Sequence, residues 1–271
     1  MDLQEMLDQA RTGTAHVAPG WGQGRATYGG LVAGLMLSAL KAQLPSDGTD
    51  AGADEGGLLP LRSMTVSFVG PLEPGEAELQ PRILRAGRSA VQGEVLVVQD
   101  GDVEAAMLAS FGRPRASQVV VDPDAQRSDL TPPEEVSVIP FIEGTTPDFL
   151  AHVDLRTADG GWAYSSAGTS HLKGYMRFRE APPVFGEEHF VSLLDAWPPA
   201  VIQMLDQPRP ASSMTWTLEL LDDVTAAPDT FWQYEVRTDQ ARDGYAHTVA
   251  HVWHPDGRLV AISRQTIAVF G

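Results

Sequence analysis

One aspartate set among apolar residues is the strongest candidate for chemistry in this sequence. Asp195 lies in the segment LLDAWPP, where removal of water from the carboxylate should raise its pKa toward neutrality. A carboxylate with such a pKa can act as a general base on a water molecule, which accelerates a reaction by about 10²–10⁴-fold. The alternative is that Asp195 only caps a helix that begins near Pro198.

Two adjacent glycines form a second candidate. Gly29 and Gly30 stand near the start of the apolar run YGGLVAGLMLSALKAQ, residues 28–43. This run predicts a buried helix, and the backbone N–H groups at its N-terminus are suited to bind a developing oxyanion. The glycines would also permit close packing of the helix against a sheet, and both roles can hold together. We therefore treat Gly29 and Gly30 as candidate substrate-binding residues.

The sequence lacks the residues and motifs that several other common chemistries require. The chain has no cysteine, which excludes thiolate catalysis, disulfides and Cys-ligated metals. GWGQGRATYGG lacks the G-x-x-x-x-G-K pattern of a phosphate loop, and no G-x-S-x-G nucleophile elbow is present. The seven histidines show no metal-binding spacing, and His247 and His251 lack carboxylate support. We expect neither a metal site nor a cofactor.

Composition limits the partners. The formal net charge of −17 over 271 residues argues against nucleic acid, which requires clustered basic residues. No apolar run approaches the roughly 20 residues of a membrane-spanning helix. The first residues, MDLQEMLDQAR, lack the basic start and apolar run of a secretory signal. A cytoplasmic protein without membrane contact is therefore expected.

The elements that must position these residues fall into two similar sets. Residues 1–11 and 28–43 predict helices, and Pro45 with the polar run SDGTDAGADEGG predicts a loop. Strands are expected at residues 61–69, 77–84, 90–98 and 103–111. A polar, proline-bearing connector follows at about residues 114–140. The second set comprises strands at residues 149–156 and 171–179, a helix within residues 190–205 that Pro198 and Pro199 open, and strands at residues 213–221, 231–238, 245–253 and 259–270.

The second set repeats the first in residues as well as in order. Ser63-Met64-Thr65 recurs as Ser213-Met214-Thr215, 150 positions later, and Asp100-Gly101 recurs as Asp256-Gly257, 156 positions later. The difference of six residues is consistent with a loop insertion. This agreement predicts an internal duplication of one helix wrapped by an antiparallel sheet.

Four segments in the same order resemble the double-hotdog acyl-CoA thioesterases of the bacterial type II and peroxisomal kind. They are YGGLVAG, residues 67–112 with their RAGRS corner, LLDAWPPA and VAISRQTIAVFG. The resemblance implies an α+β tandem (double) hotdog, with antiparallel sheets each wrapped around a long central helix. It implies an N-terminal hotdog at residues 1–115, a connector at 116–145 and a C-terminal, catalytic hotdog at 146–271. It also implies hydrolysis of acyl-CoA thioesters.

In that family an Asp, a Gln and a Ser or Thr hold and activate a water molecule. Carried over, these residues are Asp195, Gln265 and Ser213. Thr215 is the alternative hydroxyl, because it lies two residues further along and is expected on the same strand face. The first repeat has Ala109 where the second has Gln265. One working site per chain is therefore expected.

Two other functions remain open at this stage. The chain could bind acyl-CoA or acyl chains without hydrolysis, or it could resemble hotdog enoyl-CoA hydratases, since a fold does not fix a function. No histidine closely follows Asp195, which favours hydrolysis over hydration. The sheet edges of a hotdog favour pairing, so a homodimer is expected. The length and type of the acyl group do not follow from residue spacing.

Overall fold

The computed structural model describes residues 1–45 and 59–270, so the loop expected after Pro45 lies almost entirely outside the described residues. The N-terminal half contains α1 (Leu3–Ala10), β1 (Thr14–Val17), β2 (Gly22–Gln23), β3 (Ala26–Thr27), α2 (Gly29–Lys41), β4 (Leu61–Phe68), β5 (Gly75–Ala86), β6 (Ala90–Gln99) and β7 (Asp102–Gly112). The C-terminal half contains β8 (Ser137–Val138), β9 (Val153–Asp159), β10 (His171–Phe178), α3 (Glu187–Leu194), β11 (Ala211–Leu220), β12 (Trp232–Arg242), β13 (Tyr245–Trp253) and β14 (Leu259–Val269). Short 3₁₀ turns occur at η1 (Pro133–Glu135), η2 (Asp148–Ala151) and η3 (Ala200–Met204).

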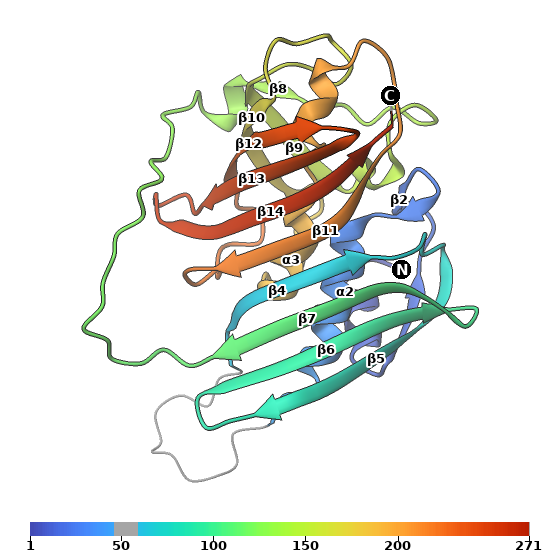
Figure 1. Cartoon of the computed structure of the whole chain (residues 1–271), viewed down its shortest axis with the longest axis vertical. Helices are drawn as coiled ribbons and strands as arrows, with labels where there is room; N and C mark the ends of the chain where they lie inside the picture. The colour runs from blue at the N-terminus through green and yellow to red at the C-terminus, as the bar shows by residue number, and fades with distance from the viewer. Residues whose placement is uncertain (46–58, 271) are drawn as a thin grey trace.

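Within the described residues, one antiparallel sheet of twelve strands carries both halves, in the order β1-β5-β6-β7-β4-β11-β14-β13-β12-β10-β9-β8 (Figure 1). The halves meet where β4 pairs with β11. Outward from that seam the strands follow the same order on both sides, β7, β6 and β5 on one and β14, β13 and β12 on the other. This is the duplicated hotdog expected from the sequence.

The register at the seam corrects one detail of the predicted repeat. Thr65 lies opposite Thr217, and their hydroxyl oxygens are 3.1 Å apart. Met64 pairs with Ala109 and Trp216 pairs with Gln265, and Ala109 and Gln265 are 156 positions apart, as the two Asp-Gly turns are. The offset between equivalent residues of β4 and β11 is thus 216 − 64 = 152, not 150. The Ser-Met-Thr triplets are therefore two positions out of structural register, because three identical residues cannot fix an alignment across loops of different length.

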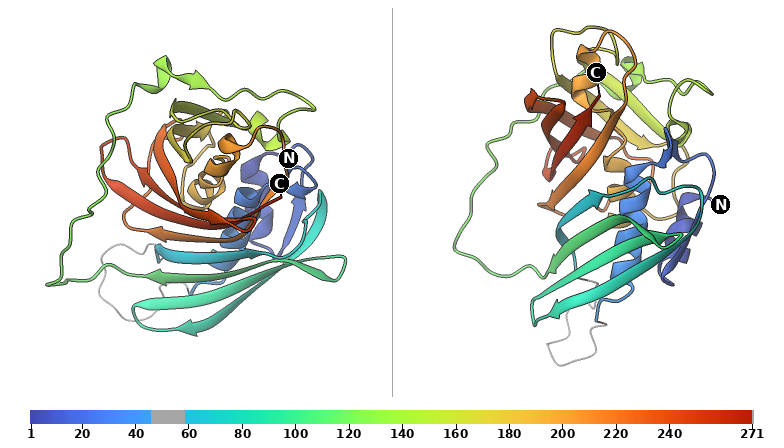
Figure 2. Two further views of the ribbon diagram at one scale, coloured as in Figure 1. Left: turned by 45° about the horizontal axis from the view of Figure 1, so that its top comes forward. Right: turned by 45° about the vertical axis from the view of Figure 1, so that its right-hand side comes forward.

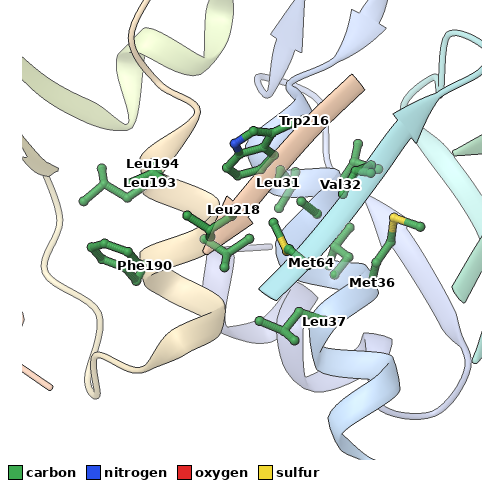
Figure 3. Packing of buried hydrophobic residues seen from close by; sticks show 14 of the residues in the cluster. Leu31, Val32, Met36, Leu37, Met64, Phe190, Leu193, Leu194, Trp216 and Leu218 are labelled. Carbon is green, nitrogen blue, oxygen red and sulfur yellow. The ribbon is translucent and has the colours of Figure 1, made fainter. Parts of the chain in front are cut away.

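The core forms where the two helices α2 and α3 pack against the sheet and against each other. The sheet curves around α2 and α3, which lie side by side on its concave face (Figure 2). All residues of α2 from Gly30 to Lys41 are buried, as expected for a helix that is apolar on every side. Figure 3 shows side chains of α2, α3, β4 and β11 meeting there, among them Leu37, Met64, Phe190 and Trp216.

Two local predictions were wrong. The strand expected at residues 149–156 begins as the turn η2, and β9 starts only at Val153. Pro147 immediately precedes η2, and its fixed φ suits the first turn of a helix. The helix expected within residues 190–205 is divided: α3 ends at Leu194, before both prolines, and the residues after them form only the short 3₁₀ turn η3, with Pro199 at its N-cap. Proline suits the first turn of a helix but lacks an N–H and disfavours helical geometry in the preceding residue.

Most of the segment between β7 and β9 runs outside the sheet (Figure 1). Ser137 and Val138 within it form β8, which pairs with β9. Further along the chain, the Arg156 guanidinium binds Asp154 at 2.9 Å and the Pro133 carbonyl at 2.7 Å. These contacts fasten the segment to the C-terminal half. Among the described residues, no helix is both long and apolar enough to cross a lipid bilayer.

Candidate active site

Asp195 occupies the C-cap of α3, so it does not cap a helix that begins at Pro198. Its carboxylate faces the N-terminus of α2 and accepts a hydrogen bond from the Gly30 N–H. A Cβ at Gly29 would lie 2.7 Å from Asp195 Oδ2 and 3.0 Å from the Phe68 ring on β4. Glycine is therefore needed at position 29 for the carboxylate to reach this place.

Gln265 and Ser213 complete a hydrogen-bonded chain to the aspartate. Gln265 Nε2 donates to Asp195 Oδ1 at 2.5 Å across 70 residues of sequence. Ser213 Oγ donates to Gln265 Oε1 at 3.2 Å. The serine thereby orients the amide so that its nitrogen faces the carboxylate. Three of the residues implied by the resemblance thus lie within hydrogen-bond reach of one another.

Alternation along β14 explains why Gln265 points inward. Gln265 lies opposite the fully buried Trp216, whereas Arg264 points outward and is 55% exposed. In the first repeat Met64 lies opposite Ala109, as Trp216 lies opposite Gln265 in the second. Ala109 therefore occupies the position of Gln265 in the first repeat and offers no polar group.

A β-bulge separates the two candidate hydroxyls. On β11 the register shifts between Ser213 and Thr215, with Met214 as the extra residue. Ser213 shares the inner face with Trp216, whereas Thr215 is exposed on the outer face. The expectation that Thr215 lies on the same face as Ser213 was wrong, because one inserted residue reverses the alternation.

Burial dominates the electrostatics of Asp195. Desolvation raises its pKa to about 7, and the hydrogen bonds from Gln265 and Gly30 oppose part of that rise. The residue nevertheless keeps partial exposure to solvent. The carboxylate therefore has an affinity for protons that is balanced near neutral pH, as a general base requires.

Two buried tyrosines that the sequence reasoning did not assign to the site, Tyr28 and Tyr234, lie close enough to this carboxylate for its charge to affect them. Tyr28 Oη donates to the Ser192 carbonyl at 2.7 Å, and Tyr234 stacks on Trp197 with ring centroids 5.3 Å apart. The pKa of each tyrosine is raised, first by burial and then by the negative charge of Asp195. Tyr28 directly precedes Gly29 and Trp197 follows Asp195 by two residues, so the sequence carried a usable signal for both. It carried no signal for Tyr234.

The corresponding place in the first repeat has different chemistry. α3 begins with Glu187 and Glu188 where α2 begins with two glycines. Both carboxylates bind the ammonium of the buried Lys41, at 3.1 and 3.0 Å. Together with Ala109, this ion-paired cluster leaves one Asp–Gln–Ser arrangement per chain within the described residues.

Comparison with protein families matches both halves. Residues 17–112 match a model described as the acyl-CoA thioesterase N-terminal domain, and residues 133–269 match one described as the acyl-CoA thioesterase C-terminal domain. No curated protein matches the chain.

Similar solved structures show the same fold over nearly the whole chain. A hot dog fold protein of unknown function from Alicyclobacillus acidocaldarius has 22% identity and a TM-score of 0.80, covering 95% of this chain and 92% of its own. A putative thioesterase II from Thermobifida fusca has 22% identity and a TM-score of 0.77, with the same coverage. An acyl-CoA thioesterase II from Mycobacterium marinum has 19% identity and a TM-score of 0.73, covering 99% of this chain and 98% of its own.

Proposed function

The chain belongs to the acyl-CoA thioesterase family, and on that premise we propose that Asp195, Gln265 and Ser213 together activate one water molecule for hydrolysis of an acyl-CoA thioester. The observation that carries the proposal is the hydrogen-bonded chain from Ser213 through Gln265 to Asp195. A neutral-range pKa on the aspartate supports it, because a general base works best when its pKa lies near the working pH.

The reaction needs only groups that this arrangement offers. Asp195 accepts a proton from the water as the water oxygen attacks the thioester carbonyl carbon. Gln265 has two N–H donors, one for Asp195 and one for the water oxygen. Collapse of the tetrahedral intermediate breaks the C–S bond, and the thiolate recovers the proton from Asp195. The products are a free carboxylic acid and CoA.

The N-terminus of α2 supports the charge that develops on the carbonyl oxygen. Backbone N–H groups at a helix start carry partial positive charge, and the start of α2 faces the Asp195 carboxylate. We propose that Gly29 and Gly30 bring this charge close to the reacting carbonyl, as in other acyl-transfer sites. Lack of a side chain at both positions permits the approach.

Thiol release from acyl-CoA, measured against pH, tests the function. The base must be deprotonated, so we expect kcat/KM to rise about tenfold per pH unit from pH 5 toward the Asp195 pKa of about 7 and then to level off. Acyl-CoAs from two to sixteen carbons should be tested. Absence of thiol release from all of them, together with measurable binding, would favour an acyl-CoA binding protein instead.

Paired substitutions on β11 test the choice of hydroxyl. Ser213→Ala should lower kcat about tenfold, because Gln265 loses the donor that fixes its amide. Thr215→Val should leave kcat within twofold, since Thr215 lies beyond the bulge on the outer face. Steady-state kinetics of both variants decide the matter. The opposite ranking would assign the role to Thr215.

A further inference from the structure

Phe68, the last residue of β4, lies beside the Asp195 carboxylate. A Cβ at Gly29 would lie 3.0 Å from the ring carbon Cζ of Phe68 and 2.7 Å from Asp195 Oδ2. Both distances start from one point, so the ring carbon and the carboxylate oxygen are at most 5.7 Å apart, the sum of 2.7 and 3.0 Å. A water molecule between them needs about 2.8 Å to the oxygen and about 3.5 Å to the carbon. No water molecule therefore fits between Oδ2 and the ring along this line.

Backbone hydrogen bonds fix the end of β4 against the start of α2. The Val69 N–H donates to the Glu104 carbonyl on β7 at 2.8 Å. In the loop that follows, the Leu72 carbonyl accepts the Thr27 N–H at 2.7 Å. Thr27 lies only two residues before Gly29, so the chain after the ring and the chain before α2 are joined directly. The ring is thereby held in a fixed place relative to the start of α2.

The equivalent place in the second repeat has a different residue. Phe68 pairs with Ala105, and Leu220 pairs with Ala261, 156 positions further on. This is the offset found between the two repeats along β7 and β14, so Phe68 and Leu220 are equivalent. Leu220 is 6% exposed, whereas Phe68 is only partly buried. The aromatic residue therefore occurs at the end of the sheet that holds the Asp–Gln–Ser arrangement.

The setting of Asp195 is governed by burial and not by neighbouring charges. Burial raises its pKa, and the groups that oppose the rise, Gln265 and Gly30, are uncharged. Tyr28 and Tyr234 respond to the Asp195 charge but stay neutral, because burial raises the pKa of each. The charged side chains of the surrounding elements lie toward the far end of each element or on the outer face, and they are Lys41 of α2, Glu187, Glu188 and His189 of α3, Arg62 of β4, Glu219 of β11 and Arg264 of β14.

We propose that Phe68 is a positioning residue of the site, whose ring keeps bulk water from one side of the Asp195 carboxylate and thereby sets the pH at which this base becomes active, an inference that rests on the proposed hydrolysis. A hydrocarbon surface against a carboxylate disfavours the charged form. The ring thus contributes to the burial that raises the pKa of Asp195 to about 7. Without the ring, water can solvate Oδ2, and the pKa should move toward the ordinary value of 3.8.

Thiol release against pH, measured for variants at position 68, tests the inference. Phe68→Ala admits water to Oδ2 and should lower the pH midpoint of kcat/KM by at least one unit. The ratio of the rate at pH 5 to the rate at pH 8 should then rise about tenfold. Phe68→Leu keeps an apolar cover, and its midpoint should stay within half a unit of that of the intact protein. Phe68→Gln is close to leucine in size but polar, so its midpoint should fall as that of Phe68→Ala does.

Leu220→Ala is the matched control. It removes a buried apolar side chain at the equivalent place of the second repeat, at the opposite end of β11 from Ser213. This variant should lose stability, as Phe68→Ala also does, but it should keep the midpoint of the intact protein. A shift of the same size in Leu220→Ala would overturn the inference, because loss of stability alone would then move the midpoint.

A midpoint that stays near 7 in both Phe68→Ala and Phe68→Gln would also overturn the inference and leave the proposed hydrolysis standing. If Phe68→Ala does not fold, equal midpoints for Phe68→Leu and Phe68→Gln would overturn it. Only the absence of thiol release by the intact protein, with every acyl-CoA, would count against the proposed function itself. The pH dependence of urea unfolding would then be the measurement. Phe68→Gln should weaken the fall in stability between about pH 4 and about pH 7, and an unchanged fall would overturn the inference.

Discussion

Asp195→Asn is expected to lower kcat/KM for thiol release by about 10²–10⁴-fold, the usual contribution of a general base. Asparagine keeps the shape of aspartate and its one acceptor oxygen can still bind an N–H donor such as that of Gln265, but its NH₂ group only donates and it cannot take a proton from water at neutral pH. The loss of turnover should therefore come mainly from the missing base. Measurement of kcat/KM at pH 8, where Asp195 of the intact protein is about nine-tenths deprotonated, gives a contrast near the maximum.

Stability provides the control for that variant. The pKa of Asp195 is about 7 in the folded protein and 3.8 for an ordinary aspartate, so the folded state binds more protons between these values. The free energy of unfolding of the intact protein should fall as pH rises from about 4 to about 7, by up to about 4 kcal/mol. Asp195→Asn should therefore be more stable than the intact protein at pH 8, and the difference should shrink at lower pH.

Urea unfolding at pH 8 and pH 5 checks the stability of the variant. The exposed Asp229 supplies a matched control, since Asp229→Asn changes charge by the same amount outside the site and should alter neither activity nor its pH dependence. Near-normal turnover by Asp195→Asn would exclude Asp195 as the base. Lower stability of the variant at pH 8 would contradict the burial argument.

Gly30→Ala is expected to impair stability and catalysis together. Its Cβ would overlap Tyr28 Oη and lie 2.5 Å from the Ser192 carbonyl oxygen, so α2 and α3 would have to separate. Overpacking of this kind costs about 1–3 kcal/mol. The same movement weakens the hydrogen bond that Gly30 donates to Asp195. Because that hydrogen bond lowers the pKa of the carboxylate, its weakening should raise the pKa. We therefore expect at least a tenfold loss of kcat and a pH midpoint above 7.

The pH midpoint separates a local effect from general damage to the fold. A destabilised protein that is still folded would lose activity equally at every pH, whereas loss of the Gly30 donor moves the profile. Gly168→Ala is the control, because a Cβ there meets no atom within 4 Å. A Gly30→Ala variant with unchanged stability and an unchanged midpoint would refute the close approach of the two helices.

The sequence predicted most elements because their signals are local. The apolar run at residues 28–43, the turns at Asp100-Gly101 and Asp256-Gly257, and the alternating strands each depend on neighbours in the chain. The failures occurred where a local pattern had two interpretations. A proline can open a helix or end one, and here α3 stops before Pro198 while the short 3₁₀ turn η3 begins after Pro199.

By itself the sequence determined the duplicated pattern of helices and strands, the apolar setting of Asp195 and the absence of a polar partner at Ala109. Only the tertiary structure decided that Asp195 meets the start of α2 and that Ser213 and not Thr215 shares the face of Gln265. The physical reason is that a strand alternates with a period of two until one inserted residue reverses it. The groups that contact Asp195 come from distant parts of the chain, and their placement depends on packing that residue spacing does not record.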